Sequence, residues 1–130
     1  MRGQNIGNMF MEIKSYNKYG AKKTVYNGVT YHSKFEAEYA KSLDWRVKAK
    51  DIRSWDRQVK ISLDVNETHI CNYFIDFLII HNNGKLEYVE IKGVETPAWK
   101  LKWKLFLAIF VKEHPKHFIT LVKRTGTTHY

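Results

Sequence analysis

The sequence predicts a mixed α/β fold in which helices pack against a central sheet. The chain has 130 residues, of which 44% are apolar and 27% charged. That length is close to the commonest domain size, and the composition is sufficient for one packed core. Apolar residues recur with helical or strand periods in the order α-β-β-β-α-β, after a short N-terminal hairpin. This order predicts an α/β sandwich built around one sheet.

The N-terminal part contains a basic arm and a hairpin. Residues 1–20 mix Gly, Asn, Lys and Tyr without a clear period, so we expect a mobile basic arm. The short apolar runs Thr24–Tyr26 and Val29–Tyr31 flank the dipeptide Asn27-Gly28. This dipeptide supplies the two left-handed residues that a tight β-hairpin requires.

A helix is predicted over residues 33–50. Ser33 and Glu36 have the spacing of a capping box, which satisfies backbone donors in the first turn of a helix. The apolar side chains of this segment fall on one side of a helical wheel. They are Phe35, Tyr39, Ala40, Leu43 and Val47.

Three strands are predicted next, over residues 58–63, 70–80 and 86–92, with a turn over 81–85. A second helix is predicted over 97–113, because Thr96 suits an N-cap and Pro97 the first helical position. Its second half, residues 105–111, is apolar all round, so we expect this part of the helix to be buried. Residues 118–122 predict a last strand. We therefore expect one domain over 21–124 and a C-terminal tail over 125–130.

Four charged residues stand at positions where apolar residues are expected. Asp76 lies inside an apolar, β-branched run, where a carboxylate is costly to bury without a partner. Glu90 and Lys92 are two residues apart in a strand and so share a face. Glu36 falls within the apolar stripe of the first helix, whereas Glu38 falls on its solvent side.

The turn at 81–85 decides whether Asp76 and Glu90 meet. A two-residue loop would pair Asn82 with Lys85 and place the two carboxylates on opposite faces. A three-residue loop with a left-handed Gly84 would pair His81 with Lys85 and set Asp76 opposite Glu90, about 5 Å away. Both loops suit the residues, and we predict the second because it brings the unusual charges together.

Adjacent carboxylates favour a shared proton or a shared cation, and oxygen ligands suit Mg²⁺ or Mn²⁺. Such a cation stabilises charge on a scissile phosphate. Lys92 could orient the attacking water or neutralise developing charge. A buried salt bridge between Lys92 and either carboxylate is the structural alternative. Gln58 could contact DNA or the water, or could be an ordinary polar residue at a strand end.

The spacing Asp76, Glu90-Ile91-Lys92 resembles the signature of the PD-(D/E)XK nuclease superfamily. The wider pattern is similar to a small phage-encoded family within it that resembles Holliday junction resolvases. The residues that carry this resemblance are Tyr31 to Tyr39, Gln58, Tyr73 to Phe77, Tyr88 to Gly93, Thr96 and the Lys-rich helix that follows. The resemblance covers about residues 20–124.

This resemblance implies a PD-(D/E)XK-type α-β-β-β-α-β core that hydrolyses DNA with Mg²⁺, for which Mn²⁺ would substitute. It implies that Glu36, Asp76 and Glu90 are metal ligands and that Lys92 is the catalytic lysine. It also implies a homodimer that cuts four-way or other branched junctions symmetrically. Two alternatives stay open: a restriction-type or transposon-end nuclease that cuts duplex DNA, and a non-catalytic DNA-binding module.

The charge distribution favours a polyanionic partner. Lys and Arg total 22 against 13 Asp and Glu, which gives a net charge of +9. The excess lies in residues 1–24 and 97–124, whereas residues 25–96 are nearly neutral. Beside Gln58, the residues that we expect to contact DNA are lysines: Lys22, Lys23, Lys34, Lys100, Lys102 and Lys104.

The expected compartment is the cytoplasm, that of the host cell if the protein is phage-encoded. Cys71 is the only cysteine, so neither an internal disulfide nor a cysteine-built zinc site is expected. We see no secretory leader and no apolar run of the roughly 20 residues that crossing a bilayer requires, and so expect no membrane association.

Overall fold

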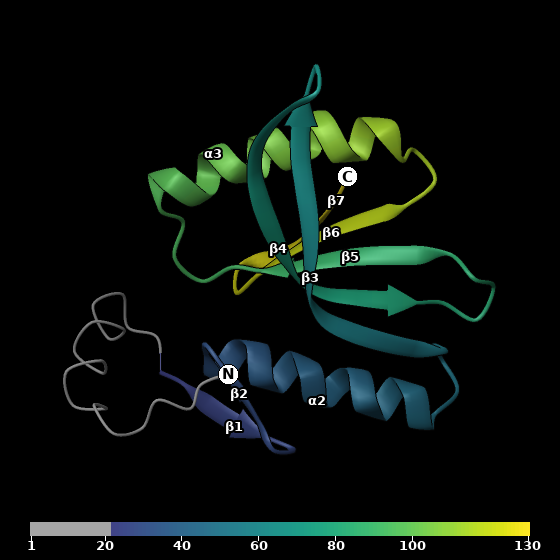
Figure 1. Ribbon diagram of the computed structural model, residues 1–130. Helices are drawn as coiled ribbons and strands as arrows, with labels where there is room; N and C mark the ends of the chain where they lie inside the picture. Colours follow the sequence, from purple (N-terminus) through teal and green to yellow (C-terminus); the bar gives the residue numbers. More distant parts are fainter. Residues whose placement is uncertain (1–21) are drawn as a thin grey trace. The chain divides into compact units, whose positions relative to one another are not determined.

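The computed structural model describes residues 22–130, which form two compact units. The first unit ends at Lys48, and the second runs from Ala49 to Tyr130. Together they hold an N-terminal hairpin, two helices and a five-stranded mixed sheet, so the predicted mixed α/β class is confirmed (Figure 1). The arm predicted over residues 1–20 lies outside the described residues.

The N-terminal unit consists of a hairpin and one helix. Strands β1 (Thr24–Tyr26) and β2 (Val29–Tyr31) pair antiparallel through a turn in which Asn27 and Gly28 both have positive φ, at 53° and 78°. The helix α2 (Lys34–Lys48) follows and contacts both strands. Ser33 caps α2, since its Oγ accepts a hydrogen bond from the backbone N–H of Glu36 at 3.1 Å. The hairpin and the first helix are therefore confirmed.

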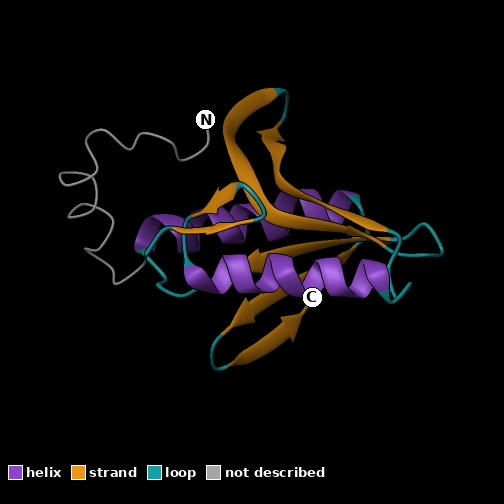
Figure 2. Cartoon of the chain, turned by 90° about the horizontal axis from the view of Figure 1, so that it is seen from below, coloured by secondary structure: helices purple, strands orange, loops and turns teal. Residues whose placement is uncertain are grey.

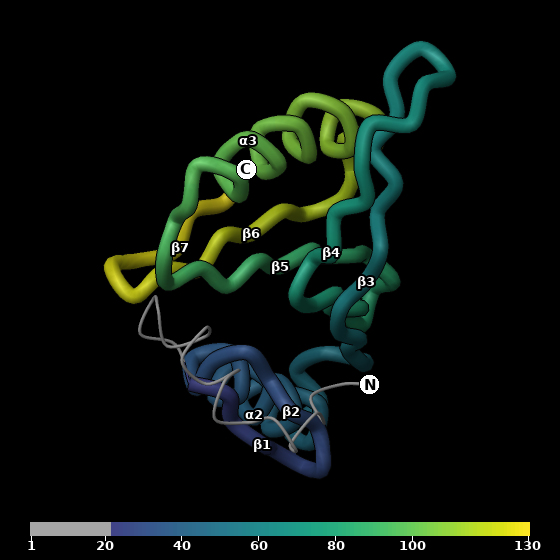
Figure 3. The backbone as a smooth tube through the Cα atoms, turned by 60° about the vertical axis from the view of Figure 1, so that its left-hand side comes forward, coloured from purple at the N-terminus to yellow at the C-terminus, as the bar shows by residue number. Residues whose placement is uncertain are grey.

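The second unit is built on one sheet with the strand order β3-β4-β5-β6-β7. The β5–β6 pair is parallel, and the other pairs are antiparallel. The strands are β3 (Ser54–Val65), β4 (Thr68–Ile80), β5 (Leu86–Ile91), β6 (Phe118–Lys123) and β7 (Gly126–His129). The β3–β4 hairpin extends beyond the remaining strands of this sheet (Figure 3).

Two of these strands differ from the prediction. β3 begins at Ser54, four residues before the predicted start, so Gln58 lies inside the strand and not at its beginning. β7 lies within the predicted tail 125–130 and pairs with β6. A four-residue strand whose side chains are all exposed carries no apolar alternation, so the sequence held no signal for it.

One helix covers a face of this sheet. α3 (Pro97–Phe106) continues into the π-helical segment η1 (Leu107–Val111) (Figures 1 and 2). Thr96 caps α3 as predicted, with its Oγ1 accepting from the backbone N–H of Trp99 at 3.1 Å. The core between α3 and the sheet is aromatic and aliphatic. Its large aromatic side chains are Tyr73, Tyr88, Trp99, Trp103 and Phe106.

The burial predicted for residues 105–111 is confirmed only in part. Phe106 is fully buried, but no residue of η1 is buried and Ala108 is exposed. The other apolar side chains of the segment are partly buried and pack against the core, namely Leu105, Leu107, Ile109, Phe110 and Val111. Among residues 22–130, no helix combines the length and the apolar character needed to cross a lipid bilayer.

Candidate active site

Asp76 lies where strand β4 separates from β5. The β4–β5 ladder ends at the pair Phe77 and Val89. At the next position, Asp76 Oδ2 accepts a hydrogen bond from the backbone N–H of Ile91 at 2.8 Å. The carboxylate thus takes the place of a backbone carbonyl in the ladder. This contact anchors Asp76 to the end of β5 and satisfies one of its two oxygens.

The neighbouring strand is distorted at the same level. Residues Arg57 and Val59 of β3 pair with β4, but Gln58 between them has a left-handed backbone, with φ at 51°. A left-handed glutamine inside a strand costs free energy, and such conformations concentrate at functional sites. Its side chain reaches Asp76, with Gln58 Nε2 donating to Oδ1 at 3.4 Å. Gln58 therefore contacts a candidate site residue.

The loop between β4 and β5 has the predicted three-residue form. The backbone N–H of His81 donates to the carbonyl of Lys85, and that of Gly84 to the carbonyl of His81, each at 2.9 Å. Gly84 has a positive φ of 86°. The register that follows pairs Ile80 with Leu86 and Phe77 with Val89. Continued by one residue, it sets Asp76 opposite Glu90, as the sequence predicts.

Glu90 is a buried carboxylate, with 5% of its surface exposed. Its Oε2 accepts a hydrogen bond from the indole Nε1–H of Trp99 at 3.0 Å. The same indole N–H also donates to the hydroxyl of Tyr73 at 3.0 Å. The N-cap Thr96 fixes the first turn of α3 and with it the position of Trp99. The other oxygen, Glu90 Oε1, is buried and has no hydrogen-bond partner.

The two carboxyl groups strongly affect each other. Burial raises the pKa of Asp76 to about 6, against the lowering effects of the Ile91 N–H, Lys92 and Arg57. Burial also raises the pKa of Glu90 well above its usual value, and the negative charge of Asp76 raises it further. Two carboxylates in this environment bind a shared proton or cation more readily than exposed ones do.

Two basic side chains accompany this pair. Lys92 follows β5, where its backbone N–H donates to the carbonyl of Val122 at 2.9 Å. Its Nζ lies 5.1 Å from the centre of the Trp99 ring, and its charge lowers the pKa of both carboxyls. Arg57 of β3 also lowers the pKa of Asp76. Lys92 therefore lies beside the carboxylates, as its spacing in the sequence predicts.

Three of these neighbours were not assigned to the site from the sequence. Trp99 is a buried residue of the core, and its indole N–H also donates to Glu90. Tyr73 lies within the resemblance but had no predicted role in the site, and Arg57 had none either, because their approach depends on how β3, β4 and α3 pack. The one local signal was the position of Trp99 in the sequence. It lies three residues after the N-cap Thr96, whose hydroxyl accepts a hydrogen bond from the Trp99 backbone N–H.

The remaining predicted residues are spread over both units. Glu36 lies in the first turn of α2, in the N-terminal unit, so its role as a third ligand of the Asp76–Glu90 pair stays a prediction. Lys34 lies 4.0 Å from Glu38 in an exposed ion pair. Lys22 and Lys23 precede β1. On α3, the side chains of three lysines are exposed, namely Lys100, Lys102 and Lys104.

The donor set can be tested against the expected metal. Within residues 22–130, no group of three or more His, Cys, Asp or Glu side chains is placed to hold an ion. Mg²⁺, however, is commonly held by one or two carboxylates, with water and substrate phosphate completing its shell. Asp76 and Glu90 provide two hard oxygen donors, and Glu90 Oε1 lacks any other partner. This pair fits Mg²⁺ or Mn²⁺ in that mode.

Residues 16–125 match the family described as "Protein of unknown function (DUF1064)", and the chain belongs to this family. The comparison with curated proteins found no match. A solved structure described as "Crystal structure of SSO0001" is similar at 15% identity, with a TM-score of 0.37. The similarity covers 96% of this chain and 58% of the other, so the chain spans little more than half the length of that protein.

Proposed function

We propose that this protein is a divalent-metal-dependent endodeoxyribonuclease with a PD-(D/E)XK-type core. The observation that carries the proposal is the convergence of Asp76 and Glu90 beside Lys92, with one buried oxygen of Glu90 left without a partner. Burying two carboxyls side by side is unfavourable for folding alone, so a role in binding a cation and a phosphate explains it best.

The chemistry is hydrolysis of a phosphodiester: water adds to phosphorus and one P–O ester bond breaks. Mg²⁺ or Mn²⁺, when bound, would neutralise charge on the phosphate and lower the pKa of the attacking water. Lys92 offers a positive charge and hydrogen-bond donors beside the carboxylates, where they orient the water or stabilise the developing charge. Gln58 holds Asp76 in position.

The proposed substrate is branched DNA, with the four-way junction as the first choice. This preference comes from the resemblance to junction resolvases, as does the proposed homodimer, in which two sites would cut two strands symmetrically. The exposed lysines of α3 suit contacts with the phosphate backbone. A cytoplasmic location within a host cell is part of the same proposal.

The first experiment compares cleavage of a labelled four-way junction with that of a linear duplex of matching sequence. Each is incubated with Mg²⁺, with Mn²⁺ and with EDTA, using the parent protein and the variants Asp76→Asn, Glu90→Gln and Lys92→Ala. Lys112→Ala serves as a matched control, because Lys112 is an exposed lysine at the far end of the helical segment. We expect paired nicks on the junction that need a divalent ion and disappear in the three site variants but not in the control.

Other outcomes would separate the alternatives. Equal cutting of the duplex would replace the junction-resolving function with a general or restriction-type nuclease. Binding without cleavage in either metal would leave a non-catalytic DNA-binding module. Cleavage by Lys92→Ala at the parent rate would remove Lys92 from the catalytic machinery.

The role of Glu36 requires a separate comparison. Glu38 lies two residues further along the same helix and is exposed, so Glu38→Gln removes the same charge from the same element. If Glu36 is the third carboxylate of the site, Glu36→Gln should lower cleavage at least tenfold and raise the Mg²⁺ concentration at which cleavage is half-maximal. Glu38→Gln should leave both unchanged. Equal activity of the two variants would limit the site to Asp76, Glu90 and Lys92.

A further inference from the structure

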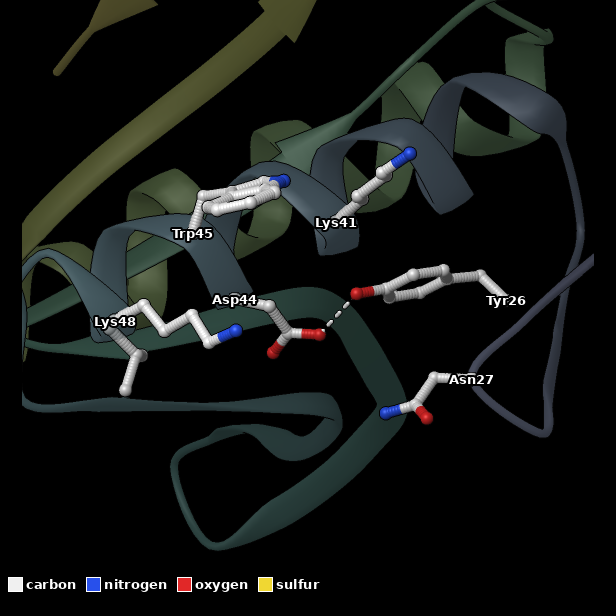
Figure 4. A pocket seen from close by; sticks show the side chains of 7 residues that line it. Tyr26, Asn27, Lys41, Asp44, Trp45 and Lys48 are labelled. Carbon is white, nitrogen blue, oxygen red and sulfur yellow. Dashed lines mark hydrogen bonds between the residues drawn. The ribbon is translucent and has the colours of Figure 1, made fainter.

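The N-terminal unit contains a pocket that lies within this unit alone. It is formed by the β1–β2 turn and by α2, and its volume is about 500 Å³, within the range typical of ligand sites (Figure 4). The residues that line it include Tyr26, Asn27, Lys41, Asp44, Trp45 and Lys48. None of them belongs to the Asp76–Glu90 pair.

Trp45 is the most unusual of these residues. Its side chain projects from the C-terminal part of α2 and is 62% exposed. A large exposed aromatic residue at a pocket is typical of a binding surface, because an exposed indole leaves apolar area in contact with water. A planar ring at this position can stack on the face of another planar group.

The charges around Trp45 select the kind of ligand. Lys41 lies one helical turn before Trp45 and Lys48 one turn after it, and the Nζ of Lys48 is 5.5 Å from the centre of the indole. Both lysines are exposed. This arrangement provides two cations, one on each side of a stacking surface along α2, and so matches an aromatic group flanked by phosphates.

The polar groups inside the pocket are a hydroxyl, a carboxylate and an amide, whereas those at its rim are the two lysines. The hydroxyl of Tyr26 donates to Asp44 Oδ2 at 2.5 Å, as Figure 4 shows, and this bond raises the pKa of Tyr26. The carboxylate of Asp44 is thereby held in one orientation. Its negative charge repels phosphate but can accept hydrogen bonds from the amino or imino groups of a nucleobase, and Asn27 adds an amide.

We propose that this pocket binds an unpaired nucleotide of a DNA strand. The base stacks on Trp45, its polar edge faces Asp44 and Asn27, and the flanking phosphates contact Lys41 and Lys48. The proposal deepens the proposed nuclease function and rests on it for the choice of DNA as the polymer. Branched DNA that carries a single-stranded arm, such as a flap, contains unpaired nucleotides, so the pocket would favour these substrates over regular duplex.

The test measures binding without cleavage. In EDTA, the protein carrying Asp76→Asn is titrated into a fluorescein-labelled oligothymidylate of 12 nucleotides and into a duplex of the same length, and anisotropy gives Kd. The added variants are Trp45→Ala, Trp45→Phe and Lys41→Ala with Lys48→Ala. The charge-matched control is Lys112→Ala with Lys116→Ala, two exposed lysines outside the pocket. Quenching of tryptophan emission is recorded in the same titrations.

We expect Trp45→Ala to weaken binding of the single strand about tenfold and of the duplex much less. Trp45→Phe should keep most of the affinity while losing most of the emission quenching, which a purely structural role for Trp45 would not produce. The Lys41 and Lys48 double variant should weaken binding more than the control pair does. Trp45 is exposed, so its substitution should not unfold the protein.

Unchanged single-strand affinity in Trp45→Ala would overturn the proposal. So would a change in sedimentation mass without a change in DNA affinity, which would make the pocket a contact between copies of the chain. Because these assays contain no active nuclease, they stay informative if the Asp76–Glu90 pair proves not to cleave DNA.

Discussion

Asp76 and Glu90 are carboxyl groups whose pKa values the fold raises, and this has a direct consequence for stability. Each group favours its protonated form more strongly in the folded chain than in the unfolded one. Their contribution to the free energy of unfolding is therefore fully present below about pH 4. It is lost as pH rises through about 6 for Asp76 and through the raised pKa of Glu90 for that residue. At neutral pH the pair lowers the free energy of unfolding, and a bound cation would offset this loss.

Neutral isosteres should remove that cost. We expect Asp76→Asn to raise the free energy of unfolding at pH 8 by about 2 kcal/mol, with little gain at pH 4. Glu90→Gln should change it in the same direction. Denaturant titrations at the two pH values measure this difference. Mg²⁺ should raise the Tm of the parent protein at pH 8 and should not raise that of either variant. A variant less stable than the parent at pH 8 would mean that the pair stabilises the fold.

Gln58 offers a second test at this scale. Glycine adopts its left-handed backbone without strain, so Gln58→Gly should raise the free energy of unfolding by about 1 kcal/mol. It should also lower cleavage, because the contact with Asp76 Oδ1 is lost. Glu67→Gly is the matched control: Glu67 also has a positive φ, at 67°, but lies at the β3–β4 turn. The control should gain stability without losing activity.

At the scale of the element, the site depends on strand β4, which has one neighbouring strand along most of its length and two at its C-terminal end. β4 pairs with β3 along most of its length, but it pairs with β5 only from Phe77 to Ile80. Asp76 lies at the point where the second pairing ends. The loop at 82–84 sets this register, because its length decides which residue of β5 stands opposite Asp76.

Shortening that loop should separate the carboxylates. Deletion of Asn83 converts the connection into a two-residue loop, which moves Glu90 to the other face relative to Asp76. We expect cleavage to disappear and cross-strand amide contacts in NMR spectra to shift by one residue. Asn83→Ala keeps the loop length and removes only the bond from the Lys85 N–H to Asn83 Oδ1, so it should stay active with a small loss of stability. Activity in the deletion variant would show that the register does not control the site.

The elements differ in how far the sequence could predict them. The β1–β2 turn, the caps at Ser33 and Thr96, and the three-residue loop were predictable, because each depends on residues within about four positions. β7 and the early start of β3 were not, since both depend on pairing with distant strands. The bond from Trp99 to Glu90 joins a helix to a strand, and only the packed structure reveals it.

At the scale of the whole molecule, the dominant property is positive charge. The net charge is +9, and the carboxylates concentrate in the middle of the sequence. Two of those carboxylates form the candidate site, while exposed lysines lie on α3 and on α2. A protein of this kind should bind nucleic acid chiefly through phosphate contacts, which release counterions.

Binding should therefore weaken steeply with salt. With four or more phosphate contacts, the slope of log K against log salt should be about −4 for duplex DNA. Lys100→Ala with Lys104→Ala should make the slope shallower by about 2, because each lost contact contributes about 0.9. The pair Lys112→Ala and Lys116→Ala should leave it unchanged. Anisotropy titrations in EDTA between about 50 and 300 mM salt would measure these slopes. The Debye length falls roughly by half over this range. Equal slopes for both pairs would assign the contacts to other lysines.

The left-handed backbone of Gln58 also bears on how the protein avoids self-association. β3 is an edge strand of the five-stranded sheet and is twelve residues long. A regular edge of that length offers its free N–H and C=O groups as a template on which a second chain can pair and begin an aggregate. Gln58 interrupts the extended backbone near the middle of β3, and the register shifts again between Leu63 and Asp64, so the longest regular stretch of this edge is Val59 to Leu63. The torsion that holds Gln58 against Asp76 therefore also protects the edge of the sheet from fibril-like growth.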